Sequence, residues 1–262
     1  MEKRIVFFDI DGTILDRNNE IPKSTIDSIH EIQSKGIEVA ISTGRAPTMF
    51  QHISEELSIN SYVSCNGSLV VYQGEVIHQE KYNIEDLREL EKKAFERGYS
   101  MMFSTKDKIW INSKSDVFID DSMSLIGLDV PTYHEATLHD EISYALLLCE
   151  TDDERFLEQY RNNFRFLRWY KYCVDVLNPD MYKAKGALKM LEYLEIPKES
   201  SVAFGDGIND LELLKFVGTG VAMGNSVESA KQASDFVTRD VADNGIAYGL
   251  KKLGLIDKTK QA

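Results

Sequence analysis

Strand-like and helix-like segments alternate at both ends of the chain, and this alternation limits the possible folds most strongly. Residues 4–8 form an apolar, β-branched and aromatic run, which predicts a strand buried on both faces. An amphipathic stretch follows at 22–36, and a second buried run follows at 37–41. A third short strand is expected at 62–65. The resulting alternation of strands and helices predicts a parallel sheet with right-handed crossovers.

The alternation breaks after residue 82 and resumes near residue 183. The intervening segment mixes expected helices with expected strands, at 85–97 and 153–163 for the helices and at 101–104, 108–111, 142–148 and 165–177 for the strands. Such a mixture is typical of an antiparallel α+β module. We therefore predict a doubly wound, Rossmann-like α/β core formed by residues 1–82 and 183–262, with an inserted α+β domain formed by residues 83–182.

Composition narrows the classes of partner and of compartment. The formal net charge of −13 argues against a nucleic-acid partner, because such proteins place clustered basic residues against phosphates. Three cysteines without a C-x-x-C spacing predict neither a disulfide framework nor a zinc site. No apolar run approaches the roughly 20 residues that a membrane helix needs. We expect a cytoplasmic protein without a membrane or nucleic-acid partner, and the oligomeric state stays open.

Two aspartates follow the first predicted strand directly, in the run Asp9-Ile10-Asp11-Gly12-Thr13. Ligands of open α/β sheets bind at the carboxyl ends of the strands, where these carboxylates fall. On extended backbone, residues two apart point the same way, so Asp9 and Asp11 can serve one substrate. The alternative is an Asp-rich turn that caps the following segment.

A second acidic loop, Gly205-Asp206-Gly207-Ile208-Asn209-Asp210, follows another buried strand. Carboxylates that converge at one edge repel each other unless a cation lies among them. Oxygen ligands without histidine or thiolate indicate Mg²⁺. A helix N-cap role for Asn209 or Asp210 is the alternative, and the two roles can coexist.

Two further segments can bind phosphate. Ser42-Thr43-Gly44-Arg45 ends the second strand, where a hydroxyl and backbone N–H groups can hold phosphate oxygens. Lys185-Gly186 opens the helix that re-enters the core and brings an ammonium group there. Each segment alone also fits a turn or a surface lysine, so their order together with the acidic loops carries the prediction.

These four segments resemble the motifs of the haloacid dehalogenase superfamily, in particular its Cof-type branch of subfamily IIB phosphatases with an inserted C2-type cap. The resemblance covers about residues 4–82 and 183–253. It includes Asn66-Gly67 and the run from Gly220 to Asn225. In the expected cap it extends only to position, length and mixed strand–helix character.

The resemblance implies a catalytic role and a metal for the acidic residues. Asp9 would be the nucleophile and a Mg²⁺ ligand. Asp11 would protonate the leaving group and then activate water, with its backbone carbonyl on Mg²⁺. Asp206 would complete the metal site. Asp210 would support the site either as a direct metal ligand or by contacting the residues that bind the metal.

The remaining implied roles concern the phosphoryl group and the substrate. Thr43, Lys185 and Asn209 would hold the phosphoryl oxygens. Gly44, Arg45 and Asn66 are possible substrate contacts, although Arg45 can equally cap the next helix.

The predicted function is Mg²⁺-dependent hydrolysis of a small phosphorylated metabolite, such as a sugar phosphate or a phosphorylated cofactor, through an aspartyl-phosphate. A phosphotransferase or mutase on the same scaffold and a non-catalytic binding module are the alternatives. The intact set of Asp9, Asp11, Lys185 and Asp206 speaks against the binding module.

Overall fold

In the computed structural model, which describes residues 3–114, 117–134, 138 and 141–257, the two ends of the chain fold together. Met1–Gly44, Gln51–His78 and Tyr182–Ala262 form one unit, here called the core unit. Arg45–Phe50 and Gln79–Met181 form the other, here called the inserted unit. The boundaries that we predicted, 82/83 and 182/183, lie close to these, but the prediction did not separate Arg45–Phe50 from the core.

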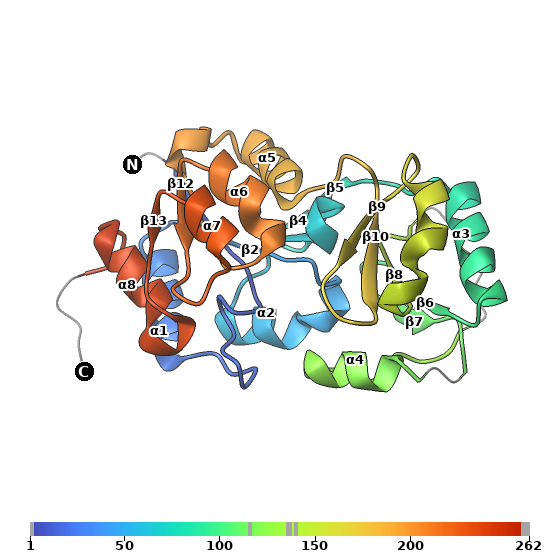
Figure 1. The fold of residues 1–262 in the computed structure, drawn as a ribbon. Coiled ribbons are helices and arrows are strands. Elements are labelled where there is room, and N and C mark those ends of the chain that lie inside the picture. Colours follow the sequence, from blue (N-terminus) through green and yellow to red (C-terminus); the bar gives the residue numbers. More distant parts are fainter. Residues whose placement is uncertain (1–2, 115–116, 135–137, 139–140, 258–262) are drawn as a thin grey trace. The chain divides into compact units, whose positions relative to one another are not determined.

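A single mixed sheet organises the core unit, with the strand order β13-β12-β11-β1-β2-β3-β4-β5 (Figure 1). Neighbouring strands from β13 to β3 pair in parallel, and β4 pairs antiparallel with β3. The strands are β1 (Ile5–Phe8), β2 (Glu38–Ser42), β3 (Tyr62–Ser64), β4 (Leu69–Tyr72), β5 (Glu75–Gln79), β11 (Ser201–Gly205), β12 (Thr219–Ala222) and β13 (Phe236–Val237).

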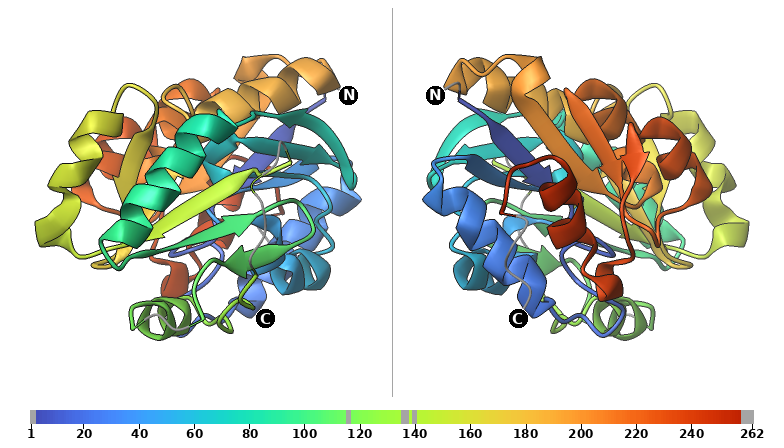
Figure 2. Two further views of the ribbon diagram at one scale, coloured as in Figure 1. Left: turned by 90° about the vertical axis from the view of Figure 1, so that its right-hand side faces the viewer. Right: turned by 90° about the vertical axis from the view of Figure 1, so that its left-hand side faces the viewer.

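Helices cover both faces of this sheet, as Figures 1 and 2 show. Helix α6 contacts both α5 and α7, all three helices contact the sheet, and α1 contacts β2, α2 and α8. Ile5 and Phe7 pack in the cluster that includes α5 and α6, whereas Phe8 stacks on Phe204. A strand apolar on both faces thus lies between two helical layers, which confirms the predicted doubly wound core. The helices are α1 (Lys23–Ser34), α2 (Gln51–Leu57), α5 (Lys183–Leu194), α6 (Leu211–Phe216), α7 (Glu228–Ala233) and α8 (Gly245–Lys252).

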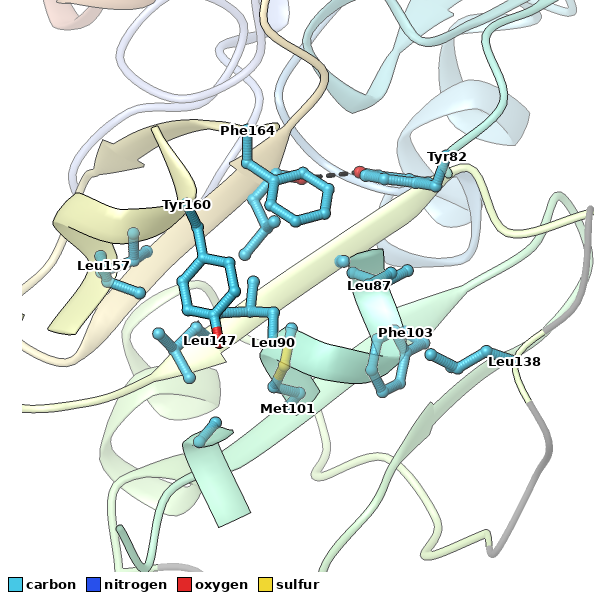
Figure 3. Close-up of a cluster of buried hydrophobic side chains, with 14 of the residues drawn as sticks. Tyr82, Leu87, Leu90, Met101, Phe103, Leu138, Leu147, Leu157, Tyr160 and Phe164 are labelled. Atoms are coloured by element: carbon cyan, nitrogen blue, oxygen red, sulfur yellow. Dashed lines mark hydrogen bonds between the residues drawn. The ribbon is translucent and has the colours of Figure 1, made fainter. Parts of the chain in front are cut away.

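The inserted unit has a sheet of its own, with the order β7-β6-β8-β10-β9 and antiparallel neighbours. One face packs against α3 and a 3₁₀ helix, η3, through a buried cluster that contains Leu90, Leu147 and Phe164 (Figure 3). Tyr82 closes the cluster by donating its hydroxyl to Val176 O at 2.7 Å. The elements are α3 (Ile84–Glu96), β6 (Ser100–Ser104), β7 (Ile109–Ile111), α4 (Ile119–Leu125), β8 (Tyr144–Leu148), η3 (Thr151–Tyr160), β9 (Arg165–Arg168) and β10 (Cys173–Leu177).

Some element predictions were wrong or incomplete. The run 165–177 is two antiparallel strands, β9 and β10, because the chain turns at 169–172. Arg168 stabilises that turn by donating to Tyr170 O and Lys171 O. The expected helix at 153–163 is the 3₁₀ helix η3, and α4, β13 and α8 were not predicted. No helix in the described part of the chain has the length and apolar content that a membrane span would need.

Candidate active site

The first strand delivers Asp9 and Asp11 to the carboxyl edge of the core sheet in different environments. Asp9 still belongs to the strand ladder, since its backbone N–H donates to Phe204 O at 3.0 Å, and its side chain is buried. The chain then turns at Ile10, whose carbonyl accepts the N–H of Ile14 at 2.9 Å. Asp11 follows directly, forms an isolated β-bridge with Leu15 and is exposed, in contrast to Asp9.

Gly12 lets this turn approach the acidic loop that follows β11. Its φ is 73°, and a Cβ atom built on it would lie 2.4 Å from Asp206 Oδ2. Asn225, from the loop after β12, donates its Nδ2 to Gly12 O at 2.7 Å and accepts from Val241 N at 3.0 Å. The turn is thus fixed to two other loops, and a side chain at position 12 would be both strained and obstructed.

A buried lysine connects the two acidic loops. Lys183 Nζ lies 2.6 Å from Asp9 Oδ1 and 2.7 Å from Asp210 Oδ1, and the lysine side chain is fully buried. Charge-assisted hydrogen bonds of this length are strong, and a buried ammonium group needs such partners. Lys183 therefore holds the carboxylates of two separate loops at the sheet edge.

The prediction assigned this place to Lys185, whereas the structure places Lys183 there. Both lysines lie in the first turn of α5, where residues two apart point about 200° away from each other. Lys183 shares the buried side of the helix with Ala187 and Met190, whereas Lys185 is only partly buried. The spacing of the apolar residues was the signal that identifies Lys183, since the same stripe continued backwards includes position 183 and not 185.

The loop after β11 holds its two aspartates in different ways. Asp210 is fully buried, and its Oδ2 accepts the backbone N–H groups of Asp206 at 3.0 Å and Gly207 at 2.9 Å. Together with the bond from Lys183 to Oδ1, both carboxylate oxygens of Asp210 have donors. Asp206 is less buried, and its Oδ1 accepts from the Thr13 hydroxyl at 3.3 Å. Asp210 thus organises the loop, as a capping residue would, and Thr13 supports Asp206 without having been predicted to do so.

Burial and the repulsion of neighbouring carboxylates disfavour the ionised forms of Asp9 and Asp206. Burial, followed by the charge of Asp210, raises the pKa of Asp9 well above its usual value, against the opposing charge of Lys183. Burial and Asp210 likewise raise the pKa of Asp206 to about 7. Asp11 contributes to both shifts, so its charge acts on both groups. For Lys183, burial lowers the pKa, but Asp210 and Asp9 outweigh it and raise the pKa above its ordinary value.

The acidic residues fit a hard divalent cation. Asp9, Asp206 and Asp210 each offer a carboxylate oxygen, and these atoms lie within 4.8 Å of one another. Burial first, and then repulsion between carboxylates, raises the pKa values of Asp9 and Asp206, and a cation would offset the repulsion. Because Asp210 already uses both oxygens, Asp9 and Asp206 are the better ligands of the three. Oxygen donors of this kind suit Mg²⁺.

The predicted phosphate-binding residues of the core lie on neighbouring loops. Thr43 N donates to Val63 O at 2.8 Å, and Asn66 N donates to Thr43 O at 3.1 Å, so the ends of β2 and β3 are tied together. Asn209 donates its Nδ2 to Asn66 Oδ1 at 3.4 Å. These contacts bring Thr43, Asn66 and Asn209 to one side of the sheet edge.

Arg45 groups with the inserted unit and contacts backbone carbonyls there. Its Nη1 donates to Met49 O at 3.3 Å, and its Nη2 donates to Ile126 O at 3.4 Å. Met49 ends the 3₁₀ helix η1 (Pro47–Met49), and Ile126 follows α4. These contacts correspond to the capping alternative for Arg45.

Comparison with known proteins gives a consistent family. The sequence profile of the haloacid dehalogenase-like hydrolases matches residues 6–250. A Bacillus subtilis (strain 168) protein that carries the name "Putative phosphatase YkrA" is 37% identical over 98% of this chain and 100% of its own length. These matches extend over nearly the whole chain, including the inserted unit.

Solved structures agree with this result. A crystal structure of a protein from Geobacillus kaustophilus HTA426 is 42% identical, with a TM-score of 0.91 over 97% of this chain and 100% of the other. The subclass IIB sugar phosphatase BT4131 is 25% identical, with a TM-score of 0.85 over 97% of this chain and 100% of its own. The chain therefore belongs to the haloacid dehalogenase-like hydrolases and is a Cof-type phosphatase.

Proposed function

We propose that this phosphatase hydrolyses a small phosphate monoester through an aspartyl-phosphate formed on Asp9. The observation that carries the proposal is the buried Asp9 carboxylate, which lies 2.6 Å from Lys183 Nζ and within 4.8 Å of ligand atoms of Asp206 and Asp210. A sugar phosphate or a phosphorylated cofactor is the expected substrate. The likeness to the sugar phosphatase BT4131 supports the first of these.

The chemistry divides into two displacements at phosphorus. In the first, an Asp9 carboxylate oxygen bonds to phosphorus, the ester P–O bond breaks, and Asp11 gives its proton to the departing alcohol oxygen. In the second, Asp11 takes a proton from water, the water oxygen bonds to phosphorus, and the bond to Asp9 breaks to release orthophosphate. The exposure of Asp11 suits a group that must reach both the leaving group and water.

Positioning and charge neutralisation supply most of the catalysis in phosphoryl transfer. Lys183 holds the orientation of Asp9 and adds positive charge at the buried edge. The Thr43 hydroxyl and the Asn209 amide would donate to phosphoryl oxygens. Asp9, Asp206 and the backbone carbonyl of Asp11 would hold Mg²⁺, which when bound neutralises charge on the phosphoryl oxygens. Asp210 would act by anchoring Lys183 and its own loop.

The inserted unit is proposed to be a C2-type cap that selects the substrate. Every residue given a chemical role above lies in the core unit, outside Gln79–Met181. Residues that recognise the leaving group are therefore expected in the inserted unit, where they can vary without altering the reaction.

Removal of divalent metal is expected to eliminate activity. The carboxylates of Asp9 and Asp206 repel each other and the anionic substrate unless a cation lies among them. Hydrolysis of an aryl phosphate should fall to background in excess chelator and return when Mg²⁺ is added in excess over the chelator. Calorimetric titration with Mg²⁺ should show binding to wild-type protein and much weaker binding to Asp206→Asn. Full activity in excess chelator would exclude the proposed metal.

Water labelled with ¹⁸O is expected to place one labelled oxygen in each orthophosphate released in a single turnover. The label distinguishes hydrolysis from transfer, because a transferase or mutase moves the phosphoryl group to another hydroxyl. A screen of phosphorylated sugars and cofactors with Mg²⁺ should first identify the best substrate, and mass spectrometry of the phosphate then provides the measurement. Phosphorylated acceptor without labelled orthophosphate would show that the enzyme transfers the group.

A further inference from the structure

The turn after β3 has an unusual backbone that two of its residues adopt at a cost. Cys65 and Asn66 both have a φ of 52°, in the left-handed region that side chains other than glycine rarely occupy, and Gly67 has a φ of 104°. Helix α5 packs closely on this turn, since a Cβ atom at Gly186 would lie 2.9 Å from Gly67 Cα. Because the packing of α5 maintains this strained backbone at the sheet edge, we infer that the turn positions a specific side chain.

The side chain that the turn places is the carboxamide of Asn66, which is 1% exposed. A Cβ atom built at Gly44 would lie 3.1 Å from Asn66 Nδ2 and 3.2 Å from its Oδ1, so the carboxamide lies directly against the loop after β2. On the other side, Asn66 Oδ1 accepts from Asn209 Nδ2 at 3.4 Å. Asn66 thus connects the loops after β2 and β11.

The contact also determines which end of the Asn209 carboxamide faces which neighbour. Asn209 Oδ1 lies beside Gly207, where a Cβ atom would come within 2.6 Å of it, and Asn209 Nδ2 faces Asn66. An amide nitrogen carries two hydrogens. One hydrogen bonds to Asn66, and the second can donate to an anion. In the flipped orientation, the carboxamide oxygen would face the anion and repel it.

We propose that Asn66 is a positioning residue, which acts on phosphoryl binding by holding the Asn209 carboxamide with its donor toward the phosphate. This inference rests on the proposed function, because it takes the Asn209 side of the sheet edge as the phosphoryl site. The direct substrate contact considered for Asn66 is not needed, since Asn66 acts through Asn209.

A double-mutant cycle in Mg²⁺ buffer tests the inference. Asn66→Gly keeps the left-handed backbone and removes the carboxamide, and Asn209→Ala removes the donor. Each is expected to weaken orthophosphate binding by about tenfold, because a hydrogen bond to a charged group is lost or misdirected. In the Asn209→Ala background, Asn66→Gly should change binding by less than about twofold. Calorimetry of orthophosphate binding and KM for an aryl phosphate are the readouts, and kcat is expected to change much less than KM.

If the losses of the two single variants multiplied, so that the double variant bound orthophosphate about one hundredfold more weakly, the inference would be overturned. An Asn66→Gly protein that binds orthophosphate normally and shows only a lower melting temperature would overturn it as well. If Asn66→Gly does not fold, Asn66→Asp takes its place, since it keeps the size and the acceptor oxygen. Asn209→Ala should then still weaken binding about tenfold in that background, and the absence of this loss would contradict the proposal. Wild-type protein that binds orthophosphate but hydrolyses no phosphate ester would refute the proposed function and leave the cycle interpretable.

Discussion

Replacing Asp9 with asparagine is expected to reduce turnover by on the order of 10⁴-fold or more while leaving the protein folded. The amide is nearly isosteric with the carboxylate but is a poor nucleophile, so the phosphoenzyme cannot form. Burial and neighbouring charges already disfavour the ionised form of Asp9 in the metal-free protein, and loss of that charge should not lower stability. Steady-state hydrolysis, with circular dichroism to confirm folding, measures both effects.

Acid-quenched mass spectrometry supplies a direct readout of the same variant. Wild-type protein should carry a phosphoryl group on the peptide that contains Asp9, and Asp9→Asn should carry none. Asp27→Asn is the matched control, because Asp27 is an exposed acid on α1 whose side chain is 62% accessible. Asp9→Ala removes any contribution from deamidation of the asparagine. Activity of Asp9→Ala within tenfold of wild type would refute the nucleophile assignment.

The sheet and its acidic edge could be predicted because their signals are local. Residues 5–8 are apolar without alternation, which is expected of a strand between two helical layers, and that is their position. Once the strand ends were located, the topology of a parallel sheet brought Asp9, Asp206 and Asp210 to one edge, where their ligand atoms lie within 4.8 Å of one another. Sequence distance was unimportant, because the strands that carry these residues, β1 and β11, are neighbours.

The inserted unit could be predicted only in outline, because its pairing is not local. The aromatic residues at 169–172 have high strand propensity, yet they form the turn between β9 and β10. What decides the turn is Arg168, whose guanidinium bonds to Cys149 O as well as to the turn carbonyls. This contact forms only because the end of β8 lies nearby, and the hydrophobic pattern of residues 165–177 cannot predict which strand will be its neighbour.

The lysine was misplaced for a different reason. The prediction began the re-entering helix at Lys185, whereas α5 begins at Lys183. An error of two residues at a helix start is common. On a helix, however, two residues correspond to about 200° of rotation, so the error moves the assigned lysine from the buried side of α5 to a partly exposed side. Lys183 also departs from the usual exposure of lysines, since its side chain is fully buried beside two carboxylate partners.

Replacing Lys183 with methionine is expected to reduce kcat/KM by on the order of 10³-fold, and the same change at Lys185 should have less than about threefold effect. Lys183→Met removes the charge that orients Asp9 and leaves Asp9 and Asp210 buried without their cation. Breaking a buried ion pair in this way costs about 3–5 kcal/mol of unfolding free energy, so the variant should also melt at a lower temperature. Lys185→Met is the matched control, since it makes the same change two positions away on another side of α5.

A compensating substitution separates the catalytic effect of Lys183 from its effect on stability. Asp210→Asn in the Lys183→Met background removes one of the two uncompensated carboxylates and should restore part of the lost unfolding free energy. It should not restore activity, because no ammonium group remains beside Asp9. Urea unfolding and aryl phosphate hydrolysis of the single and double variants give the two measurements. If activity recovered together with stability, Lys183 would be only a structural residue. If Lys185→Met were the inactive variant, the position of the catalytic lysine would revert to the one first predicted.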